Sequence, residues 1–94
     1  MRLGDTEREK INQTVFSFDP NAQVYLFGSR LDDRKKGGDI DLLITSSKIN
    51  LEEKLSIQVR LMDLLGEQKI DLLVAKSLDQ TPFVKMIAQE AQKI

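Results

Sequence analysis

The sequence predicts an α/β (α+β) fold, in which a small mixed sheet of about three strands packs against helices within one domain, residues 1–94. Two observations support this prediction. Short apolar runs that are rich in β-branched residues alternate with longer segments of helical periodicity. A chain of 94 residues also has the length of one typical domain. The predicted order of elements is α-β-loop-β-α-β-α.

The first helix is expected at residues 6–17. Thr6 and Glu9 have the spacing of a capping box, with Thr6 at the N-cap and Glu9 reaching back to it. The Asp19-Pro20 pair ends this helix. Residues 22–28, "AQVYLFG", are rich in β-branched and aromatic side chains and end in glycine, so they predict the first strand.

The polar segment 29–38 predicts a loop, which opens with one helical turn at Ser29. Further strands are expected at 39–45 and 69–75. Two more helices lie between and after them, each predicted from a cap and from an apolar stripe that we expect to be core. The caps are Asn50 with Glu53, and Thr81 with Pro82; the stripes are Leu51, Leu55, Val59, Met62 and Leu65, ended by Gly66, and Phe83, Ile87, Ala91 and Ile94.

Composition excludes several classes of function. The net charge is −1, with 14 basic and 15 acidic residues, which argues against general nucleic-acid binding but not against binding of a single nucleotide. Cysteine and histidine are absent, so a general base must be a carboxylate, a lysine or a metal-bound water. The polar first ten residues and the lack of a membrane-spanning apolar run predict a soluble, cytoplasmic protein.

Acidic residues stand near the start of two predicted core strands. Side chains alternate along a strand, so Asp39 and Asp41 share one face, and Asp71 has the matching position on the next strand. The helix between these strands has the length of a parallel crossover, which would place the three carboxylates level with one another. Buried carboxylates are costly unless they are paired or bind a metal, so we interpret these acids as ligands.

The turn at Gly28 and Ser29 predicts a phosphate site. A glycine allows phosphate to approach the backbone, while the Ser29 hydroxyl and free N–H groups donate to its oxygens. Arg30 adds positive charge, with Lys35 or Lys36 as further candidates. Carboxylates bind Mg²⁺, and Mg²⁺ binds phosphate, so the acids and the turn are two halves of a metal-nucleotide site.

Each feature also has a plainer interpretation. Gly-Ser-Arg is usually an ordinary turn, an Asp-x-Asp pair is usually a solvated strand face, and Asp71 could cap a segment or form a salt bridge. The charged run at 32–36 is typical of a solvated loop. We favour the metal-nucleotide site because these features occur together and in order, and because the acids lie on the same face of their strands.

The segments "LFGSR", "GGDIDLLI" and "KIDLLV" resemble the minimal nucleotidyltransferase family of the polymerase-β-like superfamily. The resemblance covers nearly the whole chain, including "PFVKMIAQEA". It implies nucleotide binding by Gly28, Ser29 and Arg30. It also implies a catalytic site with two Mg²⁺ ions, whose ligands would be Asp39, Asp41 and Asp71. One departure is Gly38, where many members have serine.

Minimal members of that family in prokaryotes are typically paired with a helical HEPN protein, often as antitoxin and toxin, and some transfer AMP from ATP to a toxin tyrosine. The resemblance therefore implies a protein partner, as does the expected lack of an acceptor domain. With no histidine available, Asp71 is the best candidate to take the acceptor proton. Two alternatives are a non-catalytic module that binds nucleotide or blocks its partner by contact, and an enzyme for antibiotic-like hydroxyls, completed by forming a homo-oligomer.

Overall fold

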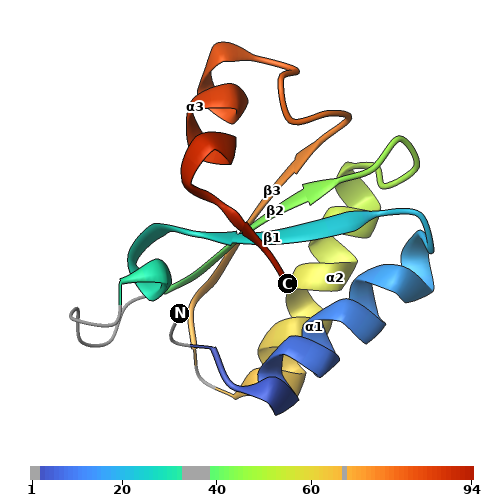
Figure 1. Cartoon of the computed structure of the whole chain (residues 1–94). Helices are drawn as coiled ribbons and strands as arrows, with labels where there is room; N and C mark the ends of the chain where they lie inside the picture. The colour runs from blue at the N-terminus through green and yellow to red at the C-terminus, as the bar shows by residue number, and fades with distance from the viewer. Residues whose placement is uncertain (1–2, 33–38, 67) are drawn as a thin grey trace.

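The computed structural model describes residues 3–32, 39–66 and 68–94, and Figure 1 shows how their helices and strands are arranged. The described elements, in chain order, are α1 (Asp5–Phe18), β1 (Gln23–Phe27), the 3-10 turn η1 (Gly28–Leu31), β2 (Ile40–Thr45), α2 (Leu51–Leu65), β3 (Ile70–Ala75), α3 (Pro82–Glu90) and β4 (Gln92–Lys93). The predicted order of elements is confirmed, including a helical turn at Ser29. None of the helices in these ranges is long and apolar enough to cross a membrane.

The described strands form one mixed sheet with the order β3-β2-β1-β4. β1 pairs with β2 in antiparallel fashion, and β2 pairs with β3 in parallel, as predicted. The short strand β4 was not predicted. It lies antiparallel to β1, and just beyond it the Ile94 N–H donates to the Val24 carbonyl at 3.0 Å. This last turn of the chain back to the sheet adds backbone hydrogen bonds at the edge of β1.

Helices cover both faces of the sheet (Figure 1): α1 and α2 lie on one face and α3 on the other. The larger core cluster includes Leu42 and Leu72, together with residues from α1 and α2. The smaller cluster includes Leu43 and Leu73, packed with Val84 of α3. Successive residues of β2 and β3 thus face opposite layers, which confirms the predicted parity of these strands.

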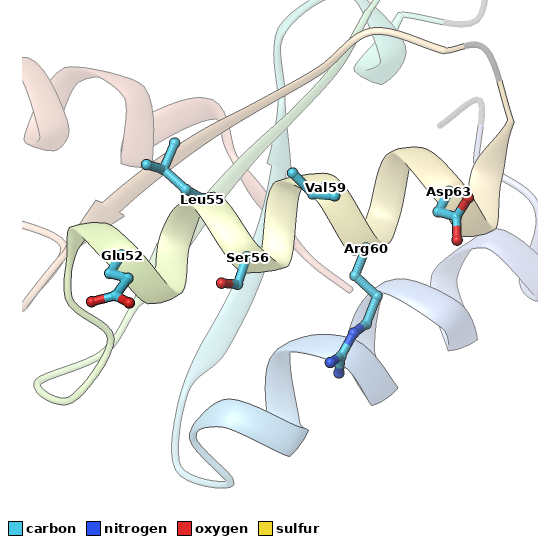
Figure 2. A pocket seen from close by; sticks show the side chains of 6 residues that line it. All are labelled: Glu52, Leu55, Ser56, Val59, Arg60 and Asp63. Carbon is cyan, nitrogen blue, oxygen red and sulfur yellow. The ribbon is translucent and has the colours of Figure 1, made fainter.

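The stripe predicted as the core face of α2 is wrong. Its residues are 48% to 69% exposed, apart from the partly buried Leu65, and they are Leu51, Leu55, Val59 and Met62. The helix buries Ile57 and Leu61 instead. Figure 2 shows Leu55 and Val59 on the side of α2 away from α1, while Arg60 points toward α1. α2 has apolar side chains on two faces, and packing against α1 and the sheet determines which one is buried.

Leucine-to-alanine substitutions at two positions of α2 test which face of the helix is buried. Leu61→Ala is expected to lower the free energy of unfolding by about 2–5 kcal/mol, because it removes a fully buried side chain and leaves a cavity. Leu55→Ala should cost less than about 1 kcal/mol, because Leu55 is 53% exposed. Urea denaturation of both variants is the measurement. A larger loss for Leu55→Ala would contradict the observed face.

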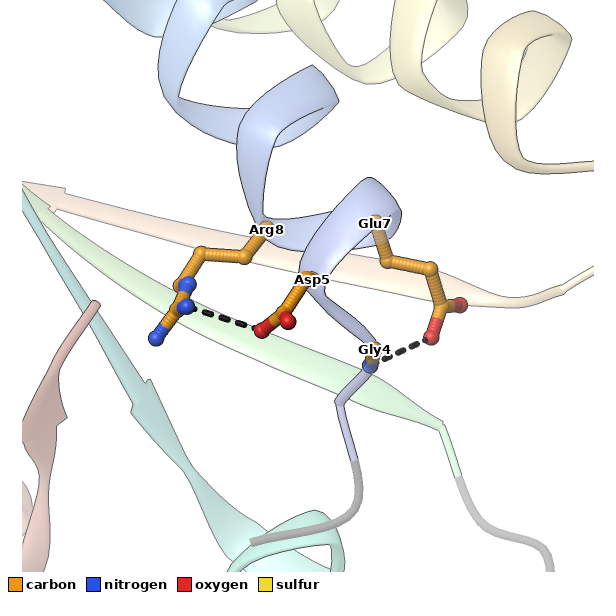
Figure 3. Close-up of polar contacts among 4 residues, drawn as sticks. All are labelled: Gly4, Asp5, Glu7 and Arg8. Carbon is orange, nitrogen blue, oxygen red and sulfur yellow. Dashed lines mark hydrogen bonds and ion pairs between the residues drawn. The ribbon is translucent and has the colours of Figure 1, made fainter.

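The start of α1 also differs from the prediction. The helix begins at Asp5, and the side chain that reaches back is Glu7, whose carboxylate accepts a hydrogen bond from the Gly4 N–H at 3.0 Å (Figure 3). The N-cap predicted at Thr6, with its partner Glu9, is therefore wrong. Both pairs have the same spacing of three residues, so spacing alone could not distinguish them.

The caps of the other two helices are confirmed. The Asn50 side chain accepts from the Glu53 N–H at 2.8 Å, and the Glu53 carboxylate accepts from the Asn50 N–H at 3.2 Å. The Thr81 hydroxyl accepts from the Val84 N–H at 3.1 Å, and proline follows directly as predicted.

The stripe predicted for the last helix is wrong in part. Ile87 packs against the smaller core cluster, as expected, but Phe83 is 58% exposed and its neighbour Val84 is the buried residue. Ala91 and Ile94 lie beyond the helix, which ends at Glu90. Ile94 instead packs against the larger cluster on the opposite face, where the return of the chain to β1 brings it.

Candidate active site

The structure brings the predicted acids and the glycine turn to one end of the sheet. Asp41 and Asp71 are directly opposite each other in the parallel register of β2 and β3. On the other side of β2, Asp41 pairs with Phe27, the last residue of β1. The turn that begins at Gly28 therefore follows at the same end, and Asp39 stands one residue before β2.

Asp41 and Asp71 are cross-strand neighbours, so their carboxyl groups can share a hydrogen bond when one of them carries a proton. Partial burial raises the pKa of Asp41 above its ordinary value, and the negative charge of Asp71, the hydrogen bond with Asp71 and the charge of Asp39 raise it further. The nearby Lys69 acts in the opposite direction but does not compensate. The site thus holds a pair of like charges that has a high affinity for protons or cations.

Asp39 has a counter-charge that was not predicted. Its Oδ2 lies 3.7 Å from Nζ of Lys69, and both side chains are substantially exposed. The Lys69 carbonyl also accepts from the Ile40 N–H at 3.0 Å, which ties the start of β3 to the start of β2. The position of Lys69 directly before the "IDLL" phrase was a possible signal, because a residue there lies beside the first acid of the neighbouring parallel strand.

Gly28 lies against the acid pair. Its φ is +79°, a conformation that L side chains rarely adopt. A Cβ at this position would overlap the Oδ2 of Asp41. Glycine is therefore required here both by the turn and by the close approach of the Asp41 carboxylate.

Arg30 is directed to a polar network at the N-terminus of α1. Its Nη2 donates to the Gln68 Oε1 at 2.6 Å, and the Gln68 Nε2 donates to the Glu7 carboxylate at 3.1 Å. Burial raises the pKa of Glu7, but the hydrogen bonds from Gly4 and Gln68 and the charge of Arg30 outweigh it and lower the pKa overall. Neither Gln68 nor Glu7 was predicted to contact Arg30. Both lie far from Arg30 in the sequence, so no local pattern indicates these contacts.

Ser29 lies in η1 next to Gly28, and its carbonyl accepts from the Asp32 N–H at 3.2 Å. The turn thus has the position expected of the predicted phosphate site. The further candidates Lys35 and Lys36, and the departure at Gly38, lie outside the described residues.

The donor set at this end suits Mg²⁺, which prefers carboxylate oxygens. Asp41 and Asp71 are opposite each other in the sheet, and burial together with the charges of Asp71 and Asp39 raises the pKa of Asp41. A divalent cation would neutralise the negative charge gathered there. Across the described ranges, no three acidic, histidine or cysteine side chains are already gathered around one metal position. Asp39 is paired with Lys69 instead. The residues therefore fit a cation that Asp41 and Asp71 would hold, with Asp39 as a further ligand if it left Lys69.

The raised pKa of Asp41 predicts a pH dependence of stability in EDTA. The folded state binds this proton more tightly than the unfolded chain, whose carboxyl has an ordinary pKa of 3.8. The ionised Asp41 thus destabilises the folded state at neutral pH. This destabilisation decreases as the pH drops through the raised pKa towards the ordinary one. Asp41→Asn should therefore be more stable than the wild type at neutral pH, and this difference in stability should shrink as the pH falls towards 3.8.

The measurement is urea denaturation of both proteins at each pH. Glu7, whose lowered pKa has the opposite effect at acidic pH, is present in both proteins, so its contribution cancels in the difference. A gap that does not change with pH would show that Asp41 does not titrate as proposed.

Comparison with known proteins agrees with this geometry. No curated protein sequence matches the chain significantly. The family model described as "Polymerase beta, Nucleotidyltransferase" matches residues 9–94, which include the glycine turn and all three acids. Together with a mixed sheet that carries helices in the order α-β-β-α-β-α, this match shows that the chain belongs to the polymerase β nucleotidyltransferase family.

Proposed function

We propose that this protein is a cytoplasmic, Mg²⁺-dependent nucleotidyltransferase that transfers AMP from ATP to a hydroxyl of a protein partner. We further propose that the acceptor is a tyrosine of a helical HEPN-type toxin and that the protein acts as its antitoxin. The observation that supports catalysis best is the Asp41–Asp71 pair, in which two carboxylates repel each other beside a turn that requires glycine. Perturbed carboxylates at such a position are typical of functional sites.

In the proposed reaction, the acceptor oxygen attacks the α-phosphorus of ATP. A new oxygen–phosphorus bond forms, the bond from the α-phosphorus to the bridging oxygen breaks, and pyrophosphate leaves. Asp71 takes the acceptor proton, while Gly28 and Ser29 position the phosphates. Mg²⁺ held by Asp39, Asp41 and Asp71 would supply neutralisation of the phosphate charge.

The outer face of α2 supports a protein partner. Four large apolar side chains, Leu51, Leu55, Val59 and Met62, are exposed along it, and contiguous apolar surface of this kind often marks a protein interface. A shallow pocket that follows this face is lined at its ends by Glu52 and Asp63 (Figure 2). This surface also gives the contact-only alternative a specific basis: the protein could block a partner by binding alone.

Co-expression with the product of the neighbouring gene tests the proposal. The complex is purified and the intact mass of the partner is measured before and after ATP and Mg²⁺ are added. We expect the partner mass to increase by one AMP. Asp41→Asn is the matched control, since it keeps the α2 face but alters the acid pair.

Three other results separate the alternatives. A stable complex whose partner mass never changes would favour the contact-only module. Efficient modification of a small hydroxyl compound by the lone protein would favour a small-molecule enzyme. A mass increase that persists in Asp41→Asn would remove the acid pair from the reaction.

A further inference from the structure

A pocket of about 290 Å³ opens on the α3 side of the sheet. It lies between the end of β1 and the C-terminal half of α3. Its lining residues are Phe27, Gly28, Met86, Ile87, Gln89 and Glu90. None of these residues other than Gly28 belongs to the site described above.

The pocket adjoins the acid pair. Gly28 lines it, and the space where a Gly28 side chain would project is filled by the Asp41 carboxylate. Asp41 and Asp71 also have the strand parity of Leu43 and Leu73, whose side chains pack in the cluster beneath α3. The acids, the glycine turn and the pocket are therefore on the same side of the sheet.

The chemistry of the lining suits a flat heteroaromatic ring. Phe27, Met86 and Ile87 provide an aromatic ring, a thioether and an aliphatic side chain, which are favourable neighbours for a π-system. Gln89 can donate and accept hydrogen bonds, and Glu90 can accept them, so both can contact the polar edge of such a ring. The volume lies near the lower limit of small-molecule pockets, about 300 Å³, which suits one ring system rather than a whole nucleotide.

We infer that this pocket binds the base of the nucleoside triphosphate, with the phosphates extending past Gly28 toward the acids. The inference rests on the proposed function, because it assumes that a nucleotide binds at that turn. It adds a role for α3: the helix selects and orients the nucleoside, while the strand ends hold the phosphates.

Met86 and Phe83 provide a matched pair of variants for the test. Both are large apolar residues of α3 with nearly equal exposure, 59% and 58%, but Met86 lines the pocket and Phe83 does not. The probes are ATP and inorganic tripolyphosphate, each titrated calorimetrically with Mg²⁺. Tripolyphosphate has the phosphate chain without a base, so it reports on the Gly28 end alone.

The wild type should bind ATP more tightly than tripolyphosphate. Met86→Ala should weaken ATP binding about tenfold, on the scale of a lost contact with a stacked base, and leave tripolyphosphate binding unchanged. Phe83→Ala should bind both probes like the wild type. Thermal melting checks that both variants remain folded.

Failure of this inference differs from failure of the proposed function. If ATP and tripolyphosphate bind the wild type equally, or if Met86→Ala binds ATP as well as Phe83→Ala does, the pocket does not hold the base, although the proposed function stands. If the wild type binds neither probe, the proposed nucleotide site is overturned, and the base pocket with it.

Discussion

Asp71→Asn is expected to slow AMP transfer by about 100-fold or more, on the scale of a lost general base. The asparagine side chain has nearly the same shape, but it cannot accept a proton and is a poor ligand for Mg²⁺. ATP binding should persist, because Gly28 and Ser29 remain in place. Single-turnover transfer and calorimetric binding of ATP measure the two effects separately.

The stability of Asp71→Asn in EDTA should not fall. The charge of Asp71 helps to raise the pKa of Asp41, so its removal relieves a repulsion. Asp63→Asn is the control for this stability measurement, because Asp63 is an exposed acid on α2, away from the acid pair. Transfer at the wild-type rate would exclude Asp71 from the mechanism, whereas a much lower melting temperature in EDTA would indicate a structural role.

Gly28→Ala should reduce transfer about 100-fold, the scale expected when reacting groups are displaced by about an ångström. The added Cβ overlaps the Asp41 carboxylate, which must move away from its position beside Asp71. The positive φ of Gly28 also costs an alanine about 1–2 kcal/mol of stability. Transfer rates and urea denaturation give the two quantities.

Gly66→Ala distinguishes the effect of backbone strain at a positive φ from the effect of the overlap with Asp41. Gly66 has a φ of +81°, close to that of Gly28, but a Cβ there would meet nothing within 4 Å. Gly66→Ala should therefore lose about 1–3 kcal/mol of stability, because its backbone conformation is essentially restricted to glycine, and it should keep its transfer rate. If the two glycine variants lose transfer equally, the cause is destabilisation and not displacement of Asp41.

The pairing of Asp41 with Asp71 could be predicted from the sequence because it follows from geometry. Side chains alternate along any strand, and a helix-length connection between adjacent strands makes them parallel. Equal positions in the two "IDLL" phrases then become neighbours in the sheet, as the structure shows. The roles assigned to these acids remain predictions.

The buried face of α2 could not be predicted in the same way. Leu55 and Val59 are as apolar as Ile57 and Leu61, so hydrophobicity marks two faces of one helix. Contacts with α1 and the sheet choose between them, and those contacts lie far away in the sequence. The strand β4 was missed for a related reason: Gln92 and Lys93 are polar, and backbone pairing with β1 makes them a strand.

The electrostatic partners in the site also depended on tertiary structure. Lys69 beside Asp39 and Gln68 beside Arg30 each join segments about thirty residues or more apart in the chain. Of the two pairs, Lys69 alone has a signal in the sequence, its place directly before the "IDLL" phrase, while no pattern marks Gln68. Arg30 illustrates the consequence. Its position after the glycine turn predicts a contact with phosphate, which stays a prediction, and the structure adds a hydrogen bond from its Nη2 to Gln68 that the sequence does not indicate.

The position of Asp71 also protects the alignment of β3. Of the strands described, β3 is at an edge of the sheet, where a strand can slip along its neighbour. A slip of one residue would turn Asp71 into the larger apolar cluster and expel Ile70 from it. The carboxylate that we assign to catalysis therefore also disfavours the misaligned sheet. Asp71→Leu removes this cost and should show more than one set of β3 amide signals in NMR spectra. Asp71→Asn, which keeps a polar side chain, should show one set.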